Sequence, residues 1–137
     1  MAQYFAIHPQ NPQPRLLAKA AEIDAVRAQL ALARGYDHNY VLDGSGGGRL
    51  ALAARVREPV SGRILEVETT EPGIQFYSGN YLDGVPARDG RSYHAYQGLA
   101  LETQFLPDSP HHPEWPQPSC WLEAGQVYDH TICYRFR

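Results

Sequence analysis

The chain has 137 residues, enough for one domain, and its 43% hydrophobic and 20% charged residues are typical of a globular protein. A formal net charge of −3 argues against nucleic acid as a partner, because phosphate binding requires a basic surface. No apolar run approaches the roughly 18 residues that span a membrane, and no secretory signal is visible at the N-terminus. We therefore expect a cytoplasmic protein whose two cysteines, Cys120 and Cys133, are reduced thiols.

The first 34 residues differ in character from the rest of the chain. Residues 1–15 are polar and rich in proline, which indicates an irregular arm. Residues 16–32 carry apolar side chains spaced three and four apart, without proline or glycine, and this pattern predicts a helix. The sequence thus divides into an N-terminal arm with a helix, residues 1–34, and a second region, residues 35–137.

From residue 36 onward apolar and polar residues alternate, which is the period of β-strands with one solvated face. Turn sequences such as EPVSG at residues 58–62 and EPG at residues 71–73 separate these runs. Strands are predicted at residues 50–56, 65–70, 74–77, 99–105 and 127–136. Several short strands with turns between them favour an all-β fold, an antiparallel β-sandwich with one N-terminal helix.

Glu102 is the first candidate for chemistry. It lies in the strand sequence LALETQF, between apolar stretches where a carboxylate without a partner would be costly. Partial burial raises the pKa of a carboxyl group, which would make Glu102 a proton acceptor near neutral pH. The alternative is a glutamate on the solvated face of an antiparallel strand.

Two further groups of polar residues are weaker candidates. Asp37 and His38 are adjacent, and in an extended segment they point to opposite faces, so at most one of them faces a given pocket. A turn or capping role is the alternative for Asp37. His111, His112 and Glu114 lie in a proline-rich loop without cysteine partners, a poor basis for a metal site, and no metal is predicted.

Four longer stretches carry a resemblance to a known family. In chain order they are GYDHNYVL at 35–42, EPVSGRILEVETTEPGIQFYSGN at 58–80, GLALETQFLPDSPHHPEWPQPSCWL at 98–122 and GQVYDHTICYRF at 125–136. Their order and spacing resemble those of the aldose 1-epimerases, the galactose mutarotase family.

The resemblance implies a galactose mutarotase-type β-sandwich that binds free hexoses in a cleft. It implies interconversion of their α and β anomers by acid–base ring opening. Glu102 matches the family's general base, and Asp37 and Gln75 match residues that contact sugar hydroxyls. The implied partner is a small-molecule hexose such as galactose or glucose, and neither a metal nor an organic cofactor is required. The family does not use the loop that holds Asp108, His111 and His112 for catalysis.

The sequence departs from the family on its N-terminal side. Family members are considerably longer, and their general acid is a histidine in the N-terminal half, which His8 does not match. We therefore expect a fragment or shortened homologue, either an active epimerase or a non-catalytic carbohydrate-binding remnant. A phosphorylated hexose would require clustered basic residues, but Arg34, Arg49 and Arg91 are scattered. Strand edges and apolar faces without partners should cause self-association or poor solubility.

Overall fold

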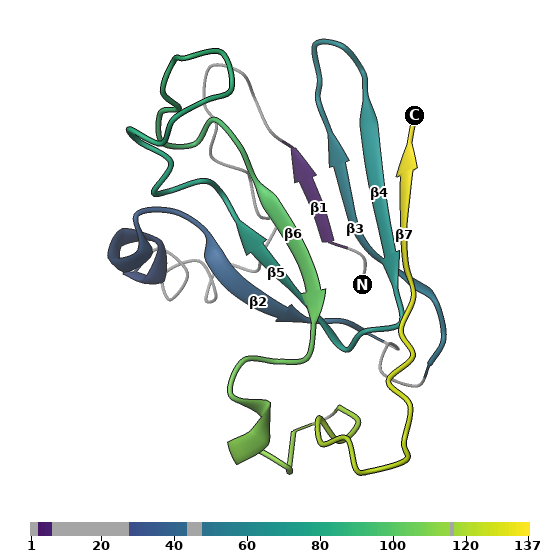
Figure 1. The fold of residues 1–137 in the computed structure, drawn as a ribbon. Coiled ribbons are helices and arrows are strands. Elements are labelled where there is room, and N and C mark those ends of the chain that lie inside the picture. The colour runs from purple at the N-terminus through teal and green to yellow at the C-terminus, as the bar shows by residue number, and fades with distance from the viewer. Residues whose placement is uncertain (1–2, 7–27, 44–47, 116) are drawn as a thin grey trace.

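A computed structural model gives the fold and describes residues 3–6, 28–43, 48–115 and 117–137 (Figure 1). Residues 28–33 are helical, and a short 3-10 helix, η1, spans Ser109–His111. The remaining regular structure is β, as the sequence predicts. In chain order the strands are β1 Gln3–Ala6, β2 Asp37–Val41, β3 Ala51–Arg57, β4 Ile64–Thr69, β5 Gly73–Tyr77, β6 Ala100–Gln104 and β7 Ile132–Phe136.

The strands form two sheets. One sheet has the order β1-β3-β4-β7 and the other the order β2-β5-β6. Neighbouring strands are antiparallel except for β1, which runs parallel to β3. Strand β4 passes into β5 through residues 70–72, so the two sheets meet at this corner (Figure 1).

One hydrophobic core is shared by both sheets. Val67 of β4 and Phe76 of β5 are among its fully buried members, and Tyr36 enters it just ahead of β2. In β3 both Ala53 and Ala54 are buried, although consecutive residues of a regular strand point to opposite sides. A register shift in the β3–β4 pairing at this point explains the exception, because a bulge turns an extra residue inward.

Both ends of the chain differ in part from the prediction. The arm expected to be irregular contains β1, whose aromatic residues favour a strand and which covers the edge of β3. The last strand is shorter than the predicted 127–136 because its partner β4 ends at Thr69. Beyond that point Thr70 and Thr131 are linked by a backbone hydrogen bond of 3.1 Å, but no ladder continues.

The predicted helix at residues 16–32 lies mostly outside the described residues. Its last turns are helical as expected, and Leu30 packs against the core. The predicted turn at residues 58–62 is also present, with Gly62 at a φ of 76° and its N–H donating to the carbonyl of Glu58 at 2.9 Å. No helix among the described residues is long and apolar enough to cross a bilayer.

Candidate active site

The three-stranded sheet has one apolar face and one polar face. Side chains alternate along each strand, and residues directly opposite one another in neighbouring strands share a face. Ile74, Phe76 and Leu101 belong to the core and define its apolar face. The other face carries six polar side chains: Asp37, Asn39, Gln75, Tyr77, Glu102 and Gln104.

The three residues singled out from the sequence lie on this polar face, one on each strand. Gln75 of the central strand is directly opposite Glu102 of β6. Its Nε2 donates to Oδ1 of Asp37 at 2.8 Å. Asp37 and Glu102 thus flank an amide on the two edge strands, about 10 Å apart if two strand spacings separate them. Carboxylates accept hydrogen bonds and the amide both donates and accepts, which suits the hydroxyl groups of a sugar.

His38 is separated from this face, as its position next to Asp37 predicts. It is opposite the buried Phe76 in the neighbouring strand, and its ring meets that of Tyr36 edge-on at 5.9 Å. Its Nδ1 accepts a hydrogen bond of 2.9 Å from the backbone N–H of Asp37. The pair is therefore a local contact and not a catalytic dyad.

Glu102 is exposed, so the expectation that it is partly buried is wrong. Its apolar neighbour Leu101 points to the core, while Glu102 itself occupies the solvated face of the strand. Burial therefore gives no reason to treat Glu102 as a base. Glu102 remains a candidate base because it shares a face with Asp37 and Gln75 and because the chain is similar to known proteins.

Comparison with known proteins identifies the family. The family model for aldose 1-epimerase matches residues 6–135 of the chain. The chain belongs to the aldose 1-epimerase family. The resemblance found in the four sequence stretches is thereby confirmed.

Named members of the aldose 1-epimerase family match most of the chain. The aldose 1-epimerase of Escherichia coli (strain K12) is 50% identical over 103 residues, which are 75% of this chain and 30% of that protein. The galactose mutarotase of Mus musculus is 47% identical over 103 residues, 74% of this chain and 29% of that protein. The aldose 1-epimerase of Haemophilus influenzae is 35% identical over 121 residues, which are 88% of this chain and 35% of that protein. The chain thus spans about a third of the length of these curated relatives.

In this member of the aldose 1-epimerase family, Asp37 is positioned by the segment that follows β5. The N–H of Tyr36 donates to Oγ of Ser78 at 2.9 Å, and the N–H of Ser78 donates to the carbonyl of Tyr36 at 3.0 Å. The amide of Asn80 donates to the same carbonyl at 3.0 Å. Sequence reasoning missed Ser78 and Asn80 as supporting residues, although both lie in the SGN end of a stretch that carries the family resemblance.

Sequence reasoning also missed Asn39. It lies two residues after Asp37 and is directly opposite Gln75, so it shares their face. The period of two in the strand was the signal that could have identified it. Asn39 is partly buried, whereas Asp37 is exposed.

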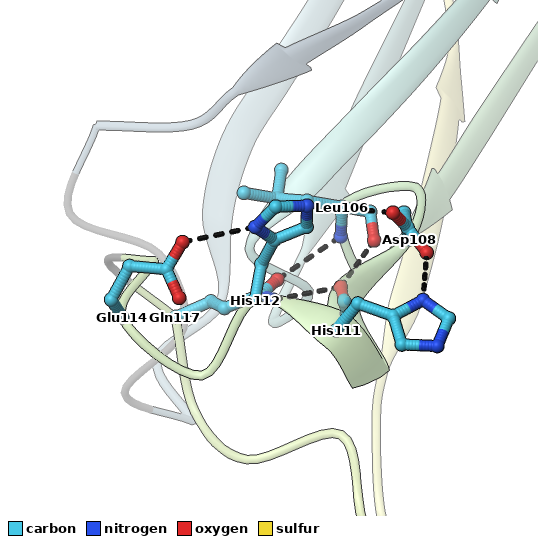
Figure 2. A network of polar contacts seen from close by, with 7 residues as sticks. Leu106, Asp108, His111, His112, Glu114 and Gln117 are labelled. Atoms are coloured by element: carbon cyan, nitrogen blue, oxygen red, sulfur yellow. Dashed lines mark hydrogen bonds and ion pairs between the residues drawn. The ribbon is translucent and has the colours of Figure 1, made fainter.

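The histidine-rich loop forms a separate network (Figure 2). Nδ1 of His111 lies 2.5 Å from Oδ1 of Asp108, and Nδ1 of His112 lies 2.9 Å from Oε1 of Glu114. The contact with His111 lowers the pKa of Asp108, and the contact with His112 lowers the pKa of Glu114. Among the described residues no group of three or more His, Cys, Asp or Glu side chains is arranged to hold a metal ion.

Proposed function

We propose that this chain carries the base-bearing part of an aldose 1-epimerase site. Glu102 takes the proton of the anomeric hydroxyl of a hexose, and Asp37 and Gln75 hold other hydroxyl groups of the same sugar. The observation that carries the proposal is that these three side chains occupy one face of a single sheet, with a hydrogen bond already linking Asp37 and Gln75. The names of the relatives agree with this activity.

Interconversion of the two anomers requires a base and an acid. Glu102 removes the proton from the hydroxyl on C1, the C1–O bond of the ring breaks, and a C1 carbonyl forms. The ring oxygen takes a proton from a second group, for which the family resemblance implies a histidine and for which water is the simplest alternative source. Rotation about the C1–C2 bond turns the carbonyl over. The former ring oxygen, now a hydroxyl, attacks C1 and gives its proton back to the second group, while Glu102 returns its proton to the carbonyl oxygen, which becomes the new anomeric hydroxyl.

Polarimetry tests the catalytic role of Glu102. Freshly dissolved α-D-galactose or α-D-glucose should reach its equilibrium rotation faster with the protein than without it. Glu102→Gln should lower the catalysed rate by about 10²–10⁴-fold, the usual contribution of a general base. Glu123→Gln, which changes another exposed glutamate, is the matched control and should leave the rate unchanged. Equal rates for the wild-type protein and Glu102→Gln would contradict the assignment.

Calorimetry with galactose tests the binding role of Asp37. Asp37→Asn removes the negative charge of the carboxylate that accepts hydrogen bonds from the sugar hydroxyls. The affinity for galactose should fall by about tenfold, the contribution of one charge-assisted hydrogen bond. Saturable binding by a wild-type protein that produces no change in mutarotation rate would instead identify a non-catalytic carbohydrate-binding protein.

A cytoplasmic location is also part of this proposal. It is supported by Cys120 and Cys133, which are both free thiols, as the sequence predicts. Alkylation of the two thiols in protein taken directly from cells would test it, because a disulfide formed in an oxidising compartment would resist the reagent.

A further inference from the structure

Asn39 is a buried amide beside the candidate active site. Its Nδ2 and Oδ1 are both buried and have no hydrogen-bond partner among the described residues. The same is true of Oε1 of Gln75, on the same face of the sheet. A buried donor or acceptor left unpaired is costly, so an unsatisfied donor beside an unsatisfied acceptor requires an explanation.

The register of β2 and β5 brings the two amides together. Asn39 and Gln75 are directly opposite each other. The N–H of Leu42 donates to the carbonyl of Pro72 at 2.9 Å, which marks a hydrogen-bonded pair at one end of this ladder. Pairs alternate in type along antiparallel strands, so Asn39 and Gln75, three pairs further along, form a non-hydrogen-bonded pair. Side chains approach each other most closely in pairs of that type.

Gly73 makes room for the amide of Asn39. A Cβ atom at residue 73 would lie 2.9 Å from Oδ1 of Asn39. The oxygen of Asn39 is therefore on the side of Gly73, and its NH₂ group is on the other side of the same planar amide.

We propose that Asn39 is a positioning residue of the epimerase site that acts through Gln75. The two unpaired groups complete each other: a hydrogen bond from Nδ2 of Asn39 to Oε1 of Gln75, which this structure does not contain, fixes the orientation of the Gln75 amide in solution, with the NH₂ group toward Asp37 and the sugar. Without this bond the Gln75 amide can rotate by half a turn and present its oxygen to the Asp37 carboxylate, two acceptors facing each other. The inference rests on the proposed function, since it concerns the same sugar site.

Three variants test the role of Asn39 in galactose binding by calorimetry. Asn39→Ala should weaken binding by about tenfold, the effect of losing one buried hydrogen bond. Asn39→Asp should be equally weak at neutral pH because a carboxylate cannot donate, and its affinity relative to Asn39→Ala should recover as the pH falls and the carboxyl group is protonated. Thr103→Val is the control, since Oγ1 of Thr103 is also buried without a partner among the described residues but faces the core side.

A double-mutant cycle separates positioning from a general structural effect. If Asn39 acts through Gln75, Asn39→Ala should cause no further loss of affinity in a Gln75→Ala background. Losses that multiply, or a ratio between Asn39→Asp and Asn39→Ala that does not change with pH, would overturn the inference.

The NMR signals of the Gln75 side-chain amide provide a measurement that needs no sugar. Asn39→Ala should shift these signals and speed their exchange with water, and Thr103→Val should not. If the wild-type protein binds no galactose, the proposed function fails for this chain and the amide signals alone decide the inference. Gln75 signals that stay unchanged in Asn39→Ala would then overturn it.

Discussion

Gly35 lies where the helical segment ends and the chain enters β2, two residues before Asp37. Its φ of +142° is a conformation that residues with a side chain rarely adopt, and a Cβ atom there would lie 2.3 Å from Oδ1 of Asn80. Asn80 is also the residue whose amide holds the carbonyl of Tyr36. The position of the candidate sugar-binding aspartate therefore depends on the absence of a side chain two residues earlier.

Gly35→Ala should destabilise the protein for two reasons, backbone strain and displacement of Asn80. We expect a loss of about 3 kcal/mol, at the upper end of the cost of strained positions. Gly84→Ala is the matched control: its φ is +80°, but nothing lies within 4 Å of the added Cβ, so it should lose only about 1 kcal/mol. Urea unfolding measures both, and equal losses would mean that the contact with Asn80 carries no energy.

At the scale of the strands, glutamates on the face of β4 opposite Val67 form ion pairs with arginines. Oε1 of Glu66 accepts a hydrogen bond of 2.7 Å from Nε of Arg55 in β3, and Oε2 lies 3.2 Å from the guanidinium of Arg137. Glu68 makes a similar contact of 3.0 Å with Arg135 of β7. The hydrogen bond from Arg55 is the main reason why the pKa of Glu66 is lowered.

This lowered pKa predicts how stability depends on pH. A carboxyl group whose pKa is lower in the folded state contributes stability above its unfolded pKa, about 4.3 for glutamate, and loses that contribution as the pH falls through the folded value. Glu66→Gln should therefore be less stable than the wild-type protein at pH 7, and the two should converge below about pH 4. Urea unfolding between pH 3 and 7 measures the difference. Arg55→Met should behave in the same way, and a difference that persists undiminished to pH 3 would contradict the argument.

The loop after β6 is held closed by one glutamine (Figure 2). Oε1 of Gln117 accepts a hydrogen bond of 3.0 Å from the N–H of the buried Leu106, and its Nε2 donates to Oγ of Ser109 at 2.7 Å. Gln117→Ala should cost about 2 kcal/mol because it leaves a buried N–H unpaired. Gln126→Ala removes a similar bond to a backbone N–H in an exposed turn and should cost less. Thermal unfolding would contradict this account if the two variants lost the same stability.

The elements differ in how far the sequence predicts them. Strands such as β4 and β5 follow from alternation and turn residues, because both signals lie within a few residues. The start of β7 could not be predicted, since it depends on where β4 stops pairing. The choice of Asp37, Gln75 and Glu102 as site residues came from the family resemblance, whereas the exposure of Glu102 depends on which segments of the chain cover the sheet. Contacts such as that of Gln117 with Leu106 could not be predicted, because they depend on how a long loop folds back on itself.

At the scale of the whole molecule, the apolar side of the larger sheet extends beyond the core. Ile132, Tyr134 and Phe136 of β7 are directly opposite Thr69, Val67 and Leu65 of β4. They therefore share the face on which Val67 is fully buried, yet Tyr134 is 51% and Phe136 79% exposed. Strand β7 is also an edge of its sheet, and no strand among the described residues pairs with one row of its backbone groups. Apolar side chains on an open edge make this strand the part of the described chain most prone to association.

We predict that the purified protein self-associates through β7. In a purified solution a second copy can cover this edge, and pairing of two such strands would also bury their apolar side chains. Light scattering should therefore give a mass above that of the monomer that rises with concentration. Phe136→Lys should weaken the association by at least about tenfold, because pairing would either bury the lysine charge or keep the two β7 strands apart. Val60→Lys is the matched control, since Val60 is 80% exposed in the turn between β3 and β4. A wild-type protein that stays monomeric at every concentration would show that β7 needs no cover.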